Sequence, residues 1–210
     1  MEPIQILDYA GIALFAATGA LAASRKQLDL IGFLFLGVVT AIGGGTVRDV
    51  VLDAPVFWVA QPGYILVPAV AAIVVYFTAH MFESRYKLLL WLDAIGLAAY
   101  AVFGAWKGYD ITGSPVIAVV MGVLTATFGG VIRDVMTGEP SVLLRPEIYI
   151  TAALTGASVF ILLQLFALPL IVAALTAAFA AFLVRAGALV WGWTFPRYNP
   201  RPGRKPEEIV

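Results

Sequence analysis

The sequence predicts an all-α membrane protein of seven transmembrane helices, six of which form an inverted repeat of three plus three. Three observations support this fold class. The 210 residues are 61% hydrophobic and only 12% charged, with a mean hydropathy of +0.94, whereas about 25% of the residues of a soluble domain are charged. Apolar runs of transmembrane length recur along the chain. A set of glycine, arginine and aspartate residues also recurs at a constant spacing.

Each apolar run is interpreted as one helix, because a hydrocarbon core of about 30 Å needs about 20 helical residues. Backbone in lipid must also satisfy its own hydrogen bonds, which favours helices. Charged residues, glycines and prolines separate the runs. The predicted helices cover residues 4–23, 28–52, 64–82, 88–106, 115–137, 147–166 and 169–191. Glycine clusters lie inside the second and the fifth, so both helices are predicted to be broken there.

These helices are predicted to form a single transmembrane domain over residues 1–192, followed by a disordered cytoplasmic tail over residues 193–210. The tail is rich in prolines and charges and has too little apolar surface to fold. The first apolar run is expected to remain as a helix. A cleaved signal peptide has positive charges before its apolar run, whereas Arg25 and Lys26 follow this one.

The distribution of positive charge predicts the orientation of the chain. Lysine and arginine in short loops concentrate on the cytoplasmic side of a membrane. With seven spans, the loops on one side carry only Lys107, whereas the other side carries nine positive residues. These are Arg25, Lys26, Arg85, Lys87, Arg145, Arg197, Arg201, Arg204 and Lys205. The N-terminus is therefore predicted to lie outside and the C-terminus in the cytoplasm.

The composition also argues against several functions. Lys plus Arg and Asp plus Glu are 13 each, so there is no basic surplus for a nucleic-acid partner. Cysteine is absent, which excludes disulfides, iron–sulfur clusters and thiol catalysis. No Walker lysine follows the glycines, and His80 is the only histidine. We therefore predict a protein that is not an enzyme and that has no metal site or other cofactor.

An internal repeat explains the recurring residues. Asp8 and Asp93 are 85 residues apart, and the same offset relates further pairs without a gap. These pairs are Gly37 and Gly122, Thr40 and Thr125, Gly44 and Gly129, Gly45 and Gly130, Arg48 and Arg133, Asp49 and Asp134, and Tyr64 and Tyr149. Repeat 1 covers about residues 8–84, repeat 2 about 93–166, and the seventh helix about 169–191. Each repeat has three spans, so the second enters the membrane from the opposite side.

The glycine clusters are the first candidate for a functional site. Glycine inside a helix costs about 1 kcal/mol relative to alanine, and contiguous glycines favour unwinding. Broken helices at corresponding places in two inverted halves are typical of a transport pathway near the membrane midplane. The alternative is that the glycines only allow close helix packing. The predicted breaks and pore lining are Gly43, Gly44, Gly45, Gly129 and Gly130, with Thr40 and Thr125.

The charged residues beside the glycines are the second candidate. An ionisable residue within a span is costly unless it is paired or hydrated. Arg48 and Asp49 point about 100° apart on a helix, so we expect each to need a partner elsewhere. The same holds for Arg133 and Asp134. Snorkelling to the headgroups is the alternative for these residues. Asp8 and Asp93 are predicted either to line the pathway or to cap the first and fourth helices.

The two copies of "GG(T/V)(V/I)RDV", the 85-residue inverted repeat and the seventh helix together resemble the prokaryotic TRIC family, the trimeric intracellular cation channels. The resemblance runs from about Asp8 to the end of the seventh helix. It implies a homotrimer in a prokaryotic plasma (inner) membrane, with one pore per subunit lined by the second and fifth helices. One departure is Phe128, which stands where repeat 1 has Gly43.

The resemblance further implies that the pore conducts monovalent cations, potassium or sodium, with Arg48, Asp49, Arg133 and Asp134 beside the helix breaks. Membrane lipid is the other expected partner. The same family has also been labelled UPF0126 and glycine transporter. A secondary transporter for a small zwitterion such as glycine is therefore the alternative, because arginine and aspartate can bind a carboxylate and an ammonium.

Overall fold

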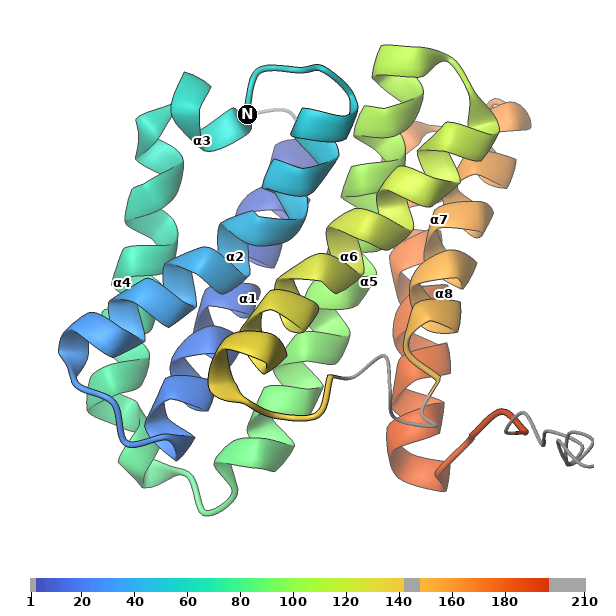
Figure 1. The fold of residues 1–210 in the computed structure, drawn as a ribbon. Coiled ribbons are helices and arrows are strands. Elements are labelled where there is room, and N and C mark those ends of the chain that lie inside the picture. The colour runs from blue at the N-terminus through green and yellow to red at the C-terminus, as the bar shows by residue number, and fades with distance from the viewer. Residues whose placement is uncertain (1–2, 142–147, 197–210) are drawn as a thin grey trace, which may run out of the picture.

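The computed structural model describes residues 3–141 and 148–196 as a bundle of helices (Figure 1). Its elements are α1 (Pro3–Arg25), α2 (Leu30–Val51), α3 (Phe57–Ala60), η1 (Pro62–Ile65), α4 (Leu66–Thr78), η2 (Ala79–Met81), α5 (Arg85–Thr112), α6 (Pro115–Thr137), α7 (Ile150–Leu165) and α8 (Leu170–Trp191). Every predicted helix is present. The third consists of η1, α4 and η2 in succession, and α3 is an additional short helix before it.

Six helical segments of the described residues are long and apolar enough to cross a membrane, and α7 is a shorter apolar helix. Successive spans run in alternating directions, so α1 begins at one end of the bundle and α8 finishes at the other (Figure 1). We call these the N end and the C end. The bundle therefore has the crossings expected of an all-α membrane protein with seven spans. The predicted disordered tail lies outside the described residues from position 197 onward.

The inverted repeat is visible in the packing. Helix α1 packs against α2 and α4 as α5 packs against α6 and α7, and α1 and α5 contact each other at the centre of the bundle. Buried alanines line these contacts, because small residues let helices approach closely where lipid gives no hydrophobic drive to association. Helix α8 has no counterpart in the first half and packs against α5 and α7.

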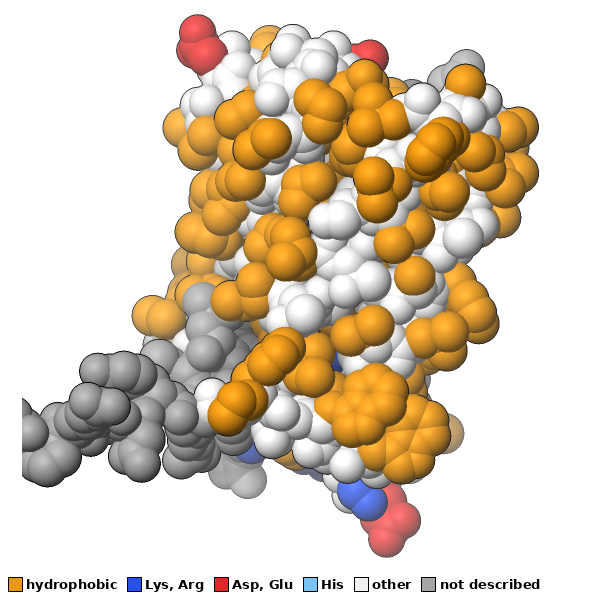
Figure 2. All heavy atoms as spheres, turned by 90° about the vertical axis from the view of Figure 1, so that its right-hand side faces the viewer, with side chains coloured by type: hydrophobic (Ala, Val, Ile, Leu, Met, Phe, Trp, Pro, Cys, Tyr) orange, Lys and Arg blue, Asp and Glu red, His pale blue; other side chains and the backbone are white. Residues whose placement is uncertain are grey.

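The outer surface is apolar, as a lipid environment requires. Figure 2 shows hydrophobic side chains over the middle of the face formed by α7 and α8, with the visible charges near the two ends. Leu175 and Phe179 of α8 are 60% and 61% exposed. A soluble monomer rarely exposes a contiguous apolar surface of this extent.

Local sequence signals set the helix ends. Asp29 caps α2 by accepting a hydrogen bond from the amide of Gly32 at 2.8 Å. Ser114 caps α6, whose first residue is Pro115, a residue suited to the first turn. Gly138 directly follows α6 and has a positive φ of 62°, and its counterpart Asp53, which follows the end of α2 and its cap Leu52, has a φ of 51°.

The paired helix ends give a test of local strain. Because a side chain disfavours positive φ and glycine does not, Asp53→Gly is expected to raise the free energy of unfolding by up to about 1 kcal/mol. Gly138→Ala, the matched change in the other half, should lower it. Thermal unfolding in a mild detergent measures both. A lower midpoint for Asp53→Gly would mean that the aspartate side chain stabilises this turn.

The fold class is confirmed, with one correction within it. Helices α2 and α6 were predicted to be broken at their glycines, yet both are continuous α-helices over Gly43–Gly45 and Gly129–Gly130. Figure 1 shows each as a single ribbon beside the other. The physical reason is that the glycines are occupied in packing. Where a Cβ would stand, each cluster meets backbone or side-chain atoms of a neighbouring segment.

Candidate functional site

The two glycine clusters meet where α2 crosses α6. A Cβ added to Gly44 would collide with the carbonyl oxygen of Thr125, and one added to Gly129 would lie 2.5 Å from the carbonyl oxygen of Thr40. Since the offset of 85 converts one contact into the other, the crossing obeys the symmetry of the repeat. The hydroxyls of Thr40 and Thr125 donate to carbonyls of their own helices, each at 2.6 Å. The glycines and threonines predicted as pore lining therefore do come together.

Each arginine–aspartate pair forms an ion pair with its own neighbour. Nη2 of Arg48 lies 2.8 Å from Oδ1 of Asp49, and Nη2 of Arg133 lies 3.0 Å from Oδ1 of Asp134. We predicted that adjacent residues could not pair, and this was wrong. The arginine side chain is long enough to bend round the helix to its neighbour, and burial strongly disfavours an unpaired charge. Both arginines are 2% exposed, so they do not snorkel to the headgroups.

The first-half pair lies toward the N end and has two further partners. Nζ of Lys107 is 2.9 Å from Oδ1 of Asp49, and the amide of Phe57 donates to Oδ2 at 3.0 Å. The guanidinium of Arg48 lies 5.2 Å from the ring centroid of Phe103. Asp49 is therefore a fully buried carboxylate that binds two cations and one backbone amide.

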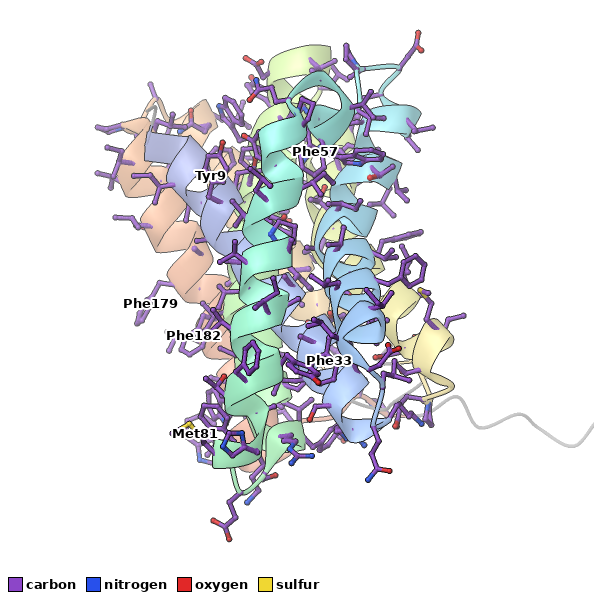
Figure 3. All side chains as sticks on the ribbon, turned by 90° about the vertical axis from the view of Figure 1, so that its left-hand side faces the viewer. Tyr9, Phe33, Phe57, Met81, Phe179 and Phe182 are labelled. Atoms are coloured by element: carbon purple, nitrogen blue, oxygen red, sulfur yellow. The ribbon has the colours of Figure 1, made fainter. Side chains whose placement is uncertain are left out.

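Aromatic rings support this first-half site. The ring of Tyr64 stacks on Tyr9 at 4.7 Å between centroids and meets Phe57 edge-on at 5.1 Å. Figure 3 shows Tyr9 and Phe57 near the N end, opposite Met81 at the C end. The rings fix Phe57, whose amide binds Asp49.

The second-half pair lies toward the C end and has different partners. Nη1 of Arg133 is 2.7 Å from Oδ1 of Asp93 and donates to the hydroxyl of Thr18 at 3.0 Å. Arg133 thus joins two buried carboxylates of repeat 2 to a threonine of α1. The offset of 85 maps Thr18 onto Phe103. The two arginines therefore contact corresponding positions, one occupied by a hydroxyl and the other by a ring.

Asp8 and Asp93 are not helix caps. Asp93 lies well inside α5, which begins at Arg85 with Ser84 as its cap, and Asp8 lies inside α1. Both carboxylates are buried, with exposed fractions of 5% and 1%. Of the two interpretations of these residues, the capping one is wrong. A role in the pathway stays a prediction.

Two cations of the site, Lys107 and Arg185, were not predicted from the sequence. Lys107 was counted only as a loop charge, because the fourth helix was predicted to end at residue 106, whereas α5 continues to Thr112. Arg185 lies in α8, where it donates to the carbonyl of Ile148 at 3.2 Å and lies 5.1 Å from the ring centroid of Tyr149. A single arginine within an otherwise apolar run was the available signal.

This geometry defines a class of protein: a polytopic membrane protein of two inverted halves, each with a buried arginine–aspartate pair beside a shared glycine crossing. A family model described as "Glycine transporter" matches the chain twice, over residues 5–80 and 90–165, which are again 85 residues apart. The chain belongs to this family, which includes the UPF0126 membrane proteins and the prokaryotic TRIC channels.

Individual relatives cover nearly the whole chain. UPF0126 inner membrane protein YadS of Escherichia coli (strain K12) is 39% identical over 198 residues, covering 91% of this chain and 94% of that protein. The TRIC trimeric intracellular cation channel orthologue from Rhodobacter sphaeroides is 51% identical, with a TM-score of 0.89 and coverage of 92% and 100%. A second structure, described in terms of conductance through TRIC cation channels, is 32% identical, with a TM-score of 0.83 and coverage of 95% and 98%.

Proposed function

We propose that this protein is a cation channel that conducts monovalent cations, potassium among them, through a pore within each subunit of a homotrimer. The observation that carries this proposal is the 51% identity, over the full length of the solved chain, to a protein described as a trimeric intracellular cation channel orthologue. The channel is not an enzyme and needs no cofactor for conduction.

The arrangement of the site supports a pathway that is narrow in the middle. The glycine crossing of α2 and α6 lies between the two charge pairs, with Arg48 and Asp49 toward the N end and Arg133 and Asp134 toward the C end. Buried carboxylates raise the local concentration of cations, and a paired guanidinium opposes them until it moves. Gly44 and Gly129 approach backbone carbonyls of the opposite helix so closely that neither position has room for a Cβ, which supports a constriction at the crossing.

The proposal also includes the membrane in which the chain lies and the orientation of its two ends. Relatives are named as inner membrane proteins, and we place this chain in a prokaryotic inner membrane. The described positive residues Arg25, Lys26, Arg85 and Lys87 follow the spans that finish at the C end, so we place that end in the cytoplasm. The N-terminus then lies outside. Membrane lipid is in contact with the apolar surface.

A carrier of a small zwitterion such as glycine is the second candidate. The description of the family model favours it. Each half also offers both a carboxylate and a guanidinium, the two groups that an amino acid requires. A carrier and a channel differ in rate, because a carrier must complete a conformational cycle for each substrate.

Reconstitution in planar bilayers tests the proposal. Purified protein is expected to give unitary cation currents, which no carrier cycle sustains. Asp49→Asn and Asp134→Asn should each lower the current, because each removes a negative charge beside the crossing. Asp29→Asn, an exposed residue outside the pathway, is the matched control. Glycine uptake into liposomes without unitary currents would contradict the channel and favour the carrier.

A further inference from the structure

Three charged side chains meet at the C end of the bundle. Oε1 of Glu139 lies 3.4 Å from Nη2 of Arg25 and 3.3 Å from Nζ of Lys26. The guanidinium of Arg25 also lies 4.6 Å from the ring centroid of Tyr86. The three charged side chains are 23% to 39% exposed, so they lie at the boundary between protein and water. We call Arg25, Lys26 and Glu139 the C-end ion cluster.

The backbone holds both sides of this cluster in place. Helix α6 ends at Thr137 and is capped by Gly138, and the amide of Glu139 donates to the carbonyl of Asp134 at 2.9 Å. Helix α1 ends at Arg25, directly before Lys26. The carbonyl end of a helix favours cations and disfavours a carboxylate. Glu139, next to the end of α6, is therefore stabilised by the two cations at the end of α1.

A small cavity lies directly beneath the cluster. Its volume is about 10 Å³, which is space for about one water molecule. Its wall contains members of the C-end ion cluster as well as the buried pair of the second half. The polar residues of this wall are Arg25, Tyr86, Arg133, Asp134, Thr137 and Glu139. The cluster therefore lies between the surrounding water and the buried Arg133–Asp134 pair, over a space too small for a hydrated cation.

The corresponding described positions at the N end cannot form this cluster. The offset of 85 relates Glu139 to Ala54, Arg25 to Asp110, and Lys26 to Ile111. An alanine, an aspartate and an isoleucine cannot form the same ion pairs. The crossing at the centre keeps the symmetry of the repeat, whereas the C-end ion cluster breaks it.

We propose that the C-end ion cluster is a gate: when Glu139 separates from Arg25 and Lys26, the ends of α1 and α6 move apart and open the C end of the pathway to Arg133. The identity of the ions that pass this gate rests on the proposed function, whereas the movement of the two helix ends does not depend on it. Ion pairs with this exposure are individually weak and screened by salt. Weak pairs suit a gate, because a modest change in free energy then shifts the open and closed populations.

The absence of cysteine from the chain permits a direct test. Thr137 lines the cavity beneath the cluster, so Thr137→Cys reports access to it. In liposomes, Glu139→Gln is expected to raise the rate at which a cationic methanethiosulfonate reagent modifies this cysteine by about two- to tenfold. High ionic strength should raise the rate of cysteine modification when Glu139 is present, and it should have less effect on this rate in Glu139→Gln. Leu52→Cys, related to Thr137 by the same offset at the N end, is the matched control and should react at an unchanged rate.

Charge reversal separates a gate from a general loss of structure. Glu139→Lys should raise the rate at residue 137, and adding Arg25→Glu with Lys26→Glu should restore the slow rate. An unchanged rate in Glu139→Gln, or an equal rise at Leu52→Cys, would overturn the gate. Absence of currents in every variant, together with the expected labelling rates, would overturn the proposed channel and support the gate.

Discussion

Replacing Arg133 by methionine is expected to destabilise the folded protein by about 3–5 kcal/mol, because it leaves the buried carboxylate of Asp93 without its ion-pair partner. The distance of 2.7 Å between the two groups and the 2% exposure of both side chains make this a fully desolvated pair. Asp134 and the hydroxyl of Thr18 lose the same guanidinium. Thermal unfolding in detergent measures the loss.

Two further variants sharpen this prediction. Arg133→Met combined with Asp93→Asn should recover part of the lost stability, because it removes both charges of the pair. Arg48→Met, at the corresponding position of the first half, should cost less, because Asp49 keeps its contact with Lys107. Equal losses for the two arginine variants would mean that Lys107 does not compensate Asp49.

Adding a methyl group at the glycine crossing is expected to have the second largest effect. Gly44→Ala and Gly129→Ala each place a Cβ against a backbone carbonyl of the other helix, which cannot move aside as a flexible side chain can. Forced overpacking of this kind costs about 1–3 kcal/mol. Because α2 and α6 must separate to relieve it, the two variants are also expected to unfold at similar temperatures.

Gly63→Ala is the control for this effect, since a Cβ at residue 63 would have no atom within 4 Å. Its midpoint of unfolding should stay near that of the wild type. If Gly44→Ala behaved like Gly63→Ala, the close contact of α2 and α6 would not be the reason for the glycines.

The topology was predictable from sequence because its signals are local or periodic. Apolar runs located the helices, although α5 continues to Thr112 instead of ending at residue 106, and the pairing of Asp8 with Asp93 and of Arg48 with Arg133 indicated the inverted repeat. The same pairs selected residues that prove to be buried beside the crossing. Repetition of residues that are costly in a membrane was therefore a sound guide to which charged residues are buried.

The conformation at the glycines was not predictable, because contiguous glycines favour an unwound helix and a close crossing alike. Only the carbonyls of Thr40 and Thr125, distant in sequence, decide between the two. The ion-pair partners of the buried charged residues were also not predictable, for a related reason. Lys107 reaches Asp49 across 58 residues (107 minus 49), and nothing in the local sequence of either residue indicates this contact.

The reciprocal contacts at the crossing also show how the surfaces of the two halves complement each other. A glycine of one helix contacts a threonine carbonyl of the other, and the same contact recurs with the roles reversed. This is the pattern of an isologous interface, in which one surface is complementary to itself and two copies associate about a twofold axis. Within one chain, the two three-helix halves therefore associate as two copies of one unit would, and α8, which has no counterpart, packs against the second half.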